Sequence, residues 1–277
     1  MGYDLRRGRG VQAAQAAGVA AGYESRDPQV LQATNNIVMW LRPHPVVAKV
    51  GTSPHSASSL SREAAASAAL AARGAPVGVP LSTELFVDEA SGLPATLWER
   101  LPEVVDEPTA VEYAATLGEV HEALRDLALD LPDFTTVLDH ARVTLFDVAS
   151  MHLLDPSNLA FVRDAFDQAD VQIRAHAFEA RPIHGEPHRN NIVNTAKGPR
   201  LIDFESVCHG PVEWDLASVD TEISDRFPRH DRDLLRVARR LNSARVATWC
   251  WHLADIPEMR HHGEVHLQLL HGDGYGR

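Results

Sequence analysis

One short stretch of the sequence carries the side chains best suited to chemistry. Residues 183–191 are Ile-His-Gly-Glu-Pro-His-Arg-Asn-Asn, and the run Leu201-Ile202-Asp203-Phe204-Glu205 follows. Glu186 supplies a carboxylate, Asn191 supplies an amide five residues later, and Asp203 supplies a second carboxylate. Such a set can align an acceptor hydroxyl, bind two magnesium ions and hold the triphosphate of a nucleotide. The spacing therefore predicts phosphoryl transfer.

The composition is that of an ordinary globular protein. The 277 residues are 44% hydrophobic and 23% charged, which allows a sizeable core in one large domain or two lobes. No apolar run approaches about 18 residues, so we expect no membrane span. The amino terminus lacks the apolar core of a secretory signal. Only Cys208 and Cys250 are present, which fits a reducing cytoplasm better than a disulfide framework. We therefore predict a cytoplasmic protein.

The charge balance bears on partners. The chain has 38 acidic and 26 basic residues, a net charge of −12. Nucleic-acid backbones attract clusters of Lys and Arg, so we expect no nucleic-acid partner. A negative field favours a cationic acceptor, such as an amino sugar or a choline-like amine. The alternative is that the acidity serves solubility alone. The oligomeric state stays open.

The predicted elements that must position these residues form a β-rich part and a helical part of the sequence. Over residues 28–101, short β-rich runs are interrupted by one Ala-rich helical segment at about residues 60–72. A further helix is expected near Val11–Ala21. The predicted strands are Gln29–Ala33, Asn36–Leu41, Val46–Val50, Glu84–Asp88 and Ala95–Glu99. This pattern indicates a small sheet with one key helix.

From Pro108 onward, helical periodicity dominates. The predicted helices are Thr109–Leu127, Thr136–Leu153, Ser157–Phe178 and Asp231–Ala254, with a weaker one after Gly263. Pro102, Asp106 and Pro108 punctuate the junction between the two parts. We therefore predict an amino-terminal lobe of residues 1–101 and a helical lobe of residues 102–277.

The motifs resemble those of a known family, the aminoglycoside phosphotransferase and choline kinase-like family, a branch of the protein-kinase-like fold. Four positions match its pattern His-Gly-Asp-x-His-x-x-Asn: His184, Gly185, His188 and Asn191. Glu186 stands where the pattern has Asp. The segment Ile202–Glu205 and the run Gly-Pro-Val-Glu-Trp-Asp-Leu-Ala at 210–217 are also typical of the family. The resemblance is strong over residues 183–217 and weaker in the amino-terminal part.

The resemblance implies a fold and a reaction. The fold is α+β and bilobal, with a small antiparallel β-sheet lobe that binds nucleotide. A larger, mainly helical lobe carries the catalytic loop and the acceptor site. The implied cofactors are ATP, with GTP as the alternative nucleotide, and Mg²⁺. The implied acceptor is a hydroxyl of a small molecule, such as an aminoglycoside or amino sugar.

The resemblance also implies roles for the residues of the opening motif. Glu186 would accept a hydrogen bond from the acceptor hydroxyl and align it with the γ-phosphate. Asn191 and Asp203 would bind magnesium through oxygen, as a hard cation requires. Phosphoryl transfer depends mainly on positioning and charge neutralisation, so Glu186 acts chiefly as an aligning group.

Other residues of the motif are expected to support the loop. His184 and Asp215 would brace it, and His188 would either contact phosphate or support the loop. The family usually has Pro-Gly before the Asn, whereas this chain has Arg189 and Asn190. Asn tolerates a left-handed backbone better than most residues, so we expect Asn190 to stand in for the glycine.

The nucleotide side of the predicted site comes from the first lobe. Lys49, in an apolar strand, resembles the lysine that contacts the α- and β-phosphates, and Glu63 in the next helix is its expected partner. The alternative is that Glu63 is merely favoured by the helix dipole. Asn36 lies at a turn without glycine and is a candidate phosphate contact. The backbone at Glu99 and Leu101 matches the hinge that would meet the adenine.

The replacement of Asp by Glu186 raises the question whether the protein is catalytically active. Glu reaches one carbon–carbon bond further than Asp, and a displacement of about 1 Å can lower a rate roughly 100-fold. Either the site is adapted to Glu, or a catalytically silent, pseudokinase-like nucleotide-binding protein remains. Retention of Lys49, Glu63, Asn191 and Asp203 favours activity. We predict an enzyme, a Mg-ATP-dependent phosphotransferase with an alcohol group as acceptor. A choline or sugar kinase of metabolism is an alternative.

Overall fold

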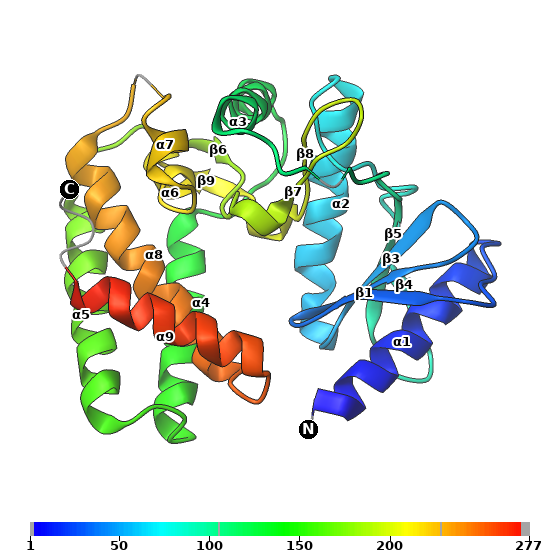
Figure 1. Ribbon diagram of the computed structural model, residues 1–277, viewed down its shortest axis with the longest axis horizontal. Helices are drawn as coiled ribbons and strands as arrows, with labels where there is room; N and C mark the ends of the chain where they lie inside the picture. Colours follow the sequence, from blue (N-terminus) through cyan, green and yellow to red (C-terminus); the bar gives the residue numbers. More distant parts are fainter. Residues whose placement is uncertain (1–2, 105, 228, 273–277) are drawn as a thin grey trace. The chain divides into compact units, whose positions relative to one another are not determined.

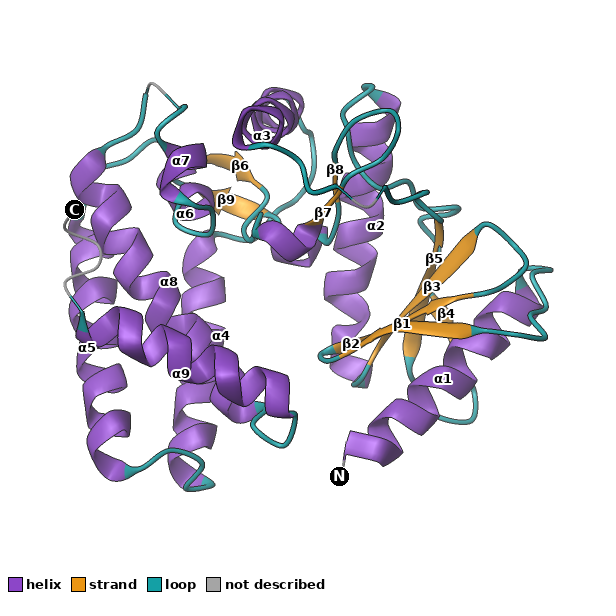
Figure 2. Cartoon of the chain, viewed as in Figure 1, coloured by secondary structure: helices purple, strands orange, loops and turns teal. Residues whose placement is uncertain are grey.

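The computed structural model describes residues 3–104, 106–227 and 229–272, and the chain divides into two compact units. The first unit contains Met1–Asp130 and His188–Val207, and the second contains Leu131–Pro187 and Cys208–Arg277. The first unit holds the five-stranded sheet, whereas the second is mainly helical (Figure 2). The mixed α+β character predicted from the sequence is therefore present.

The first unit is built on an antiparallel sheet with the strand order β1-β2-β3-β5-β4. Its strands are β1 (Gln29–Ala33), β2 (Asn36–Trp40), β3 (Val46–Gly51), β4 (Phe86–Val87) and β5 (Pro94–Glu99). Strand β4 is shorter than the predicted Glu84–Asp88. Its flanks turn instead: the Ser82 hydroxyl accepts from the Glu84 amide, and the Asp88 carboxylate accepts from the Ser91 amide.

Helix α1 (Tyr3–Ala20) packs on one face of this sheet (Figure 1). Alternate residues of a strand point to opposite faces, and the alanines of α1 contact one set. This core comprises Ala13, Ala14, Ala17, Ile37, Met39, Leu41, Val46, Ala48, Val50, Leu93 and Ala95. The helix begins well before the predicted Val11. A Cβ on Gly10 would lie 2.3 Å from Ile37 Cγ1, so glycine permits the close approach of α1 to β2.

The other face of the sheet carries Lys49. Because Ala48 and Val50 face α1, Lys49 must project to the opposite side of β3. Helix α2 (Ala57–Ala72) packs against β5, the neighbour of β3, and buries Glu63. Strand alternation and helix packing thus place a basic and an acidic side chain toward each other.

The rest of the first unit consists of one helix, one hairpin and short turns. It contains helix α3 (Ala110–Arg125) and a hairpin of β7 (Ile192–Val193) and β8 (Arg200–Leu201). Two 3₁₀ turns flank that hairpin, η2 (Arg189–Asn191) and η3 (Phe204–Ser206). A third, η1 (Pro54–Ser56), precedes α2.

The second unit is a helical assembly with a two-stranded sheet. Its elements are α4 (Phe134–Ser150), α5 (Pro156–Ala175), β6 (Arg181–Ile183), β9 (Cys208–Gly210), α6 (Val212–Leu216), α7 (Thr221–Ser224), α8 (Arg232–His252) and α9 (Pro257–His271). Helices α4, α5, α8 and α9 share one apolar core with Trp214. Helix α9 starts at Pro257, before the predicted Gly263, because proline suits the first turn of a helix.

The two units divide the chain differently from the predicted lobes. Helix α3 packs on β8, and Val77 forms a β-bridge with Leu201, so residues 102–130 and 188–207 belong to the first unit. The functional division into residues 1–101 and 102–277 stays a prediction. Within the described residues, no helix combines the length and the apolar character needed to cross a membrane.

Candidate active site

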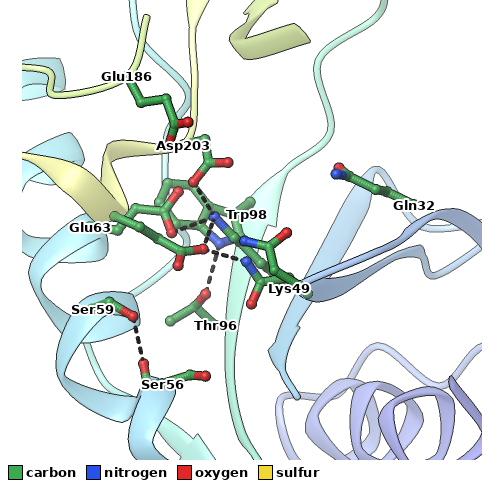
Figure 3. A network of polar contacts seen from close by, with 12 residues as sticks. Gln32, Lys49, Ser56, Ser59, Glu63, Thr96, Trp98, Glu186 and Asp203 are labelled. Carbon is green, nitrogen blue, oxygen red and sulfur yellow. Dashed lines mark hydrogen bonds and ion pairs between the residues drawn. The ribbon is translucent and has the colours of Figure 1, made fainter. Parts of the chain in front are cut away.

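Lys49 lies among three carboxylates in the first unit (Figure 3). Its Nζ is 2.7 Å from Glu63 Oε2, 2.8 Å from Asp203 Oδ1 and 2.6 Å from Glu205 Oε1. Lys49 and Glu63 are both buried. The structure thus brings together Lys49, Glu63 and Asp203, three of the predicted site residues. It adds Glu205, two positions after Asp203, to which the sequence analysis gave no role.

Burial disfavours the charged forms of the side chains in this cluster. Burial raises the pKa of Glu63 to about 8, although the Lys49 ammonium partly opposes the change. Burial likewise raises the pKa of Glu205. Burial alone would lower the pKa of Lys49, but the attraction of the three carboxylates raises it well above the ordinary value. Lys49 therefore stays cationic, and the cluster has more acidic than basic groups.

The acidic side of the cluster fits a hard divalent cation. Carboxylate oxygens of Glu63, Asp203 and Glu205 all lie within 4.8 Å of one another. Magnesium prefers oxygen ligands and usually takes one or two carboxylates together with phosphate and water. A magnesium ion would offset the excess of acidic groups. The residues present therefore suit the metal that phosphoryl transfer requires.

The β7–β8 hairpin aligns the two predicted magnesium ligands. Ile192 pairs with Leu201, and one step outward the Asn191 carbonyl accepts the Ile202 amide at 2.9 Å. Asp203 follows with a φ of 67°, in the left-handed region. Asp adopts this region more readily than most residues. Asn191 and Asp203 thus come from the same end of one hairpin, and their role as metal ligands stays a prediction.

Three further nucleotide-site predictions have defined surroundings in the first unit. Asn36 is buried, and its Nδ2 donates to Glu205 Oε1 at 2.5 Å, so its amide joins the Lys49 cluster. The Glu99 amide donates to the Val79 carbonyl at 2.9 Å, which removes that donor from any adenine contact. In the described part of the chain, the Leu101 amide has no hydrogen-bond partner. The nucleotide contacts of all three residues stay predictions.

The loop that carries Glu186 is braced within the second unit. Asp215, in α6, accepts the His184 amide at 2.9 Å and the Gly185 amide at 2.6 Å. His184 Nδ1 in turn accepts the Glu186 amide at 3.3 Å. His184 and Asp215 are fully buried. These contacts have the bracing geometry that the family resemblance implies.

His188 and its neighbours form a short 3₁₀ turn. His188 Nδ1 accepts the Asn190 amide at 3.2 Å, so the side chain supports the loop locally. Asn190 lies in this turn and does not adopt a left-handed backbone, and the expectation that it replaces a glycine was wrong. The turn hydrogen bond fixes a right-handed conformation there. Arg189 pairs with Glu107 at 2.7 Å on an exposed surface.

Sequence reasoning missed the partner of Glu186. Arg245 of α8 donates from Nη2 to Glu186 Oε1 at 2.8 Å. The Arg245 side chain is 13% exposed and that of Glu186 is 28% exposed. The two residues are 59 positions apart, and no motif in the sequence links them.

Comparison with known families identifies the chain. A sequence profile described as the phosphotransferase enzyme family matches residues 15–240, which is most of the chain. The chain belongs to the phosphotransferase enzyme family. No curated protein sequence matches it. Arg245 lies beyond the residues that this family profile covers.

Solved structures of phosphotransferases share the fold. The choline kinase LicA from Streptococcus pneumoniae is 12% identical, with a TM-score of 0.69 and coverage of 96% of this chain and 99% of that one. A choline/ethanolamine kinase family protein from Mesorhizobium loti is 16% identical, with a TM-score of 0.64 and coverage of 96% and 95%. The GDP and kanamycin complex of APH(2")-IIia is 14% identical, with a TM-score of 0.63 and coverage of 92% and 95%.

These comparisons confirm several predictions. The recognition of the aminoglycoside phosphotransferase and choline kinase-like family is confirmed, and so is the kinase-like α+β fold. Membership of the phosphotransferase family makes the chain a small-molecule phosphotransferase with a hydroxyl group as acceptor. The roles assigned to individual residues stay predictions.

Proposed function

We propose that this phosphotransferase transfers the γ-phosphoryl group of Mg-ATP to a hydroxyl of a small molecule. The cluster of Lys49 with Glu63, Asp203 and Glu205 carries the proposal. A buried ammonium beside carboxylates that suit magnesium is the set that binds nucleotide phosphates in kinase-like enzymes. A solved structure with this fold is a complex with GDP and kanamycin, so GTP is the alternative nucleotide.

Each residue of the first unit has a task in this proposal. Lys49 contacts the α- and β-phosphates, and Glu63, fixed in α2, keeps its ammonium in place. Asp203 and Asn191 hold magnesium, with Glu205 beside them. The metal supplies neutralisation of the charge on the phosphoryl group during transfer. The buried position of Lys49 keeps water away from the ion pair.

Glu186 has its task in the second unit. Its carboxylate accepts a hydrogen bond from the acceptor hydroxyl and directs that oxygen toward the γ-phosphorus. The proton of the hydroxyl passes toward the carboxylate as the oxygen–phosphorus bond forms and ADP leaves. His184 and Asp215 keep the loop backbone fixed while this happens. Alignment of this kind contributes more than proton removal in phosphoryl transfer.

The acceptor is proposed to be a small cationic molecule, such as an aminoglycoside, an amino sugar or a choline-like amine. The net charge of −12 supports this class, because a negative field attracts cations. Relatives with the same fold include a kanamycin complex and a choline kinase.

The test combines a substrate panel with two lysine variants. Purified protein is mixed with Mg²⁺, ATP or GTP, and aminoglycosides, amino sugars and choline, and the phosphorylated product is measured by mass spectrometry. The chain has only two lysines, Lys49 and the exposed Lys197. Lys49→Met should abolish turnover, whereas Lys197→Met should leave it unchanged.

Two results would contradict the proposal in different ways. If the protein neither binds nucleotide nor phosphorylates any member of the panel, the proposed reaction is wrong. If it binds Mg-ATP tightly without turnover, and Glu186→Asp gains no activity, the catalytically silent alternative is favoured. Turnover that survives Lys49→Met would remove the assigned role of Lys49.

A further inference from the structure

Glu186 is held by a guanidinium that is itself fixed. Arg245 Nη2 donates to Glu186 Oε1 at 2.8 Å and also to Asn242 Oδ1 at 3.0 Å. Arg245 Nε donates to the same Asn242 oxygen at 3.2 Å. The guanidinium carbon lies 5.7 Å from the centre of the Trp214 ring. These contacts leave Arg245 little freedom to rotate away from the carboxylate.

The supports of Arg245 are parts of the helical core. Asn242 lies one turn before Arg245 on α8 and is buried. Trp214 is fully buried and lies next to Asp215, which braces the catalytic loop. The guanidinium is therefore anchored to the same core that anchors the loop backbone. A fixed donor on a rigid element can position a side chain more accurately than a loop alone.

A longer acidic side chain needs such a donor. Glu has one more rotatable bond than Asp, so its carboxylate has more orientations to lose when it engages a substrate. A charge-assisted hydrogen bond to an arginine selects one orientation and favours the ionised form. The 2.8 Å contact places such a donor on Glu186 Oε1.

We propose that Arg245 is the positioning residue that makes Glu186 effective at the place where the family pattern has Asp. Arg245 acts through Glu186 and transfers no group itself. The inference rests on the proposed phosphoryl transfer, because it assigns Glu186 the task of aligning the acceptor hydroxyl. Arg245 itself lies outside the family profile, whose match ends at residue 240.

Two titratable groups next to the pair have pKa values far from neutral. Burial raises the pKa of Cys250 to about 12. Burial, together with Arg245 and His262, lowers the pKa of His266 to about 4. Asp215 is bound to the loop amides behind Glu186. Because Arg245 is one cause of the lowered pKa of His266, its removal acts on His266 as well as on Glu186, and a variant without His266 separates the two effects.

The kinetic test uses Arg245→Met, Arg245→Lys and the matched control Arg236→Met, an exposed arginine on the same helix. We expect Arg245→Met to lower kcat about 100-fold and to leave the KM for nucleotide within twofold. Arg245→Lys, which keeps the charge but loses the planar fork, should lose about 10-fold. The acid limb of the pH profile should move up by about 1 unit in Arg245→Met. His266→Gln, as a background, shows whether His266 contributes.

A double-mutant comparison separates positioning from general damage. In the Glu186→Gln background, Arg245→Met should cause no further loss, because its only route to the reaction is gone. In the Glu186→Asp background, the shorter carboxylate no longer reaches Arg245, so the added loss should also be small. Equal, additive losses in all backgrounds would overturn the proposal. So would an unchanged kcat and pH profile in folded Arg245→Met.

A spectroscopic measurement keeps the inference testable if no acceptor is turned over. The side-chain carboxyl of Glu186 is followed by ¹³C NMR in glutamate-labelled protein and is assigned with Glu186→Gln. Its titration midpoint should lie about 1 pH unit higher in Arg245→Met than in the unchanged chain and should change less in Arg245→Lys, which keeps the charge. Identical midpoints would overturn the inference, whatever the assays show. Absent turnover with a shifted midpoint would count against the proposed function alone.

Discussion

Glu205 Oε1 lies 2.6 Å from Lys49 Nζ, as close as either of the other two carboxylates. The same oxygen accepts the Asn36 amide at 2.5 Å. Glu205 therefore ties β2 and β3 to the turn that follows the β7–β8 hairpin. The contact makes Glu205 a member of the Lys49 cluster, where we propose that nucleotide binds, whereas the sequence resemblance directed attention to Asp203.

Glu205→Gln should weaken Mg-nucleotide binding about 10-fold, because a charge beside the metal ligands is lost while the shape is kept. Binding without magnesium should change much less. Calorimetric titration of ATP with and without Mg²⁺ measures the difference. Glu89→Gln, at an exposed turn of the same unit, is the control. Equal affinities for the Glu205 variant and the unchanged chain would remove Glu205 from the site.

Removal of Lys49 should destabilise the fold as well as the site. In Lys49→Met the buried Glu63 loses its partner, and such a loss costs about 3–5 kcal/mol. The double variant Lys49→Met/Glu63→Leu should recover part of that stability, because the most deeply buried carboxylate of the cluster is removed together with its partner. Urea unfolding at pH 7 gives the free energies. A double variant no more stable than the single one would mean that the pair does not behave as a unit.

Local sequence patterns predicted most of the helices and strands, because the two have different hydrophobic periodicities. The starts and ends of elements differ from the prediction where packing overrides propensity. Helix α1 runs through Gly10, a poor helix former, because that glycine fits against Ile37. Strand β4 shrinks to Phe86–Val87 because local turns form on both sides of it.

Only those residues of the candidate site that belong to a recognisable motif could be predicted from the sequence. The motif located Glu186, Asn191 and Asp203, and the resemblance added Lys49. The partners that complete the site are distant in sequence: Asn36 contacts Glu205 across 169 positions. Side-chain pairs of this kind depend on the tertiary fold, and a single sequence gives no signal for them.

Asp215 should be essential to the loop through two hydrogen bonds. Asp215→Ala leaves the buried His184 and Gly185 amides without this acceptor. Each unsatisfied buried donor costs roughly 1–3 kcal/mol, so we expect a loss of about 3 kcal/mol in total. Asp215→Asn keeps one acceptor oxygen and should lose less.

Urea unfolding and turnover measured on both Asp215 variants test this expectation. Asp225→Ala, at an exposed position after α7, is the control. If Asp215→Ala has the stability and rate of the control, the bracing role of Asp215 is wrong.

His266 should make the second unit sensitive to acid. It lies on α9 with Nδ1 3.3 Å from Ser243 Oγ, and burial, with Arg245 and His262, lowers its pKa from 6.5 to about 4. Between pH 6.5 and 4, therefore, His266 is protonated in the unfolded chain but neutral in the folded chain. The contribution of neutral His266 to the free energy of unfolding is fully present above pH 6.5 and is lost as the pH falls toward 4. A shift of this size corresponds to about 3 kcal/mol.

His266→Gln should remove this part of the acid sensitivity, because its side chain does not titrate. Unfolding free energies measured in urea at about pH 7.5, above the two pKa values, and at about pH 5.5 and 4.5, between them, should fall less steeply for the variant than for the unchanged chain. The exposed His261→Gln, on the same helix, should follow the unchanged chain. Parallel curves for the His266 variant and the unchanged chain would show that His266 takes up its proton without unfolding.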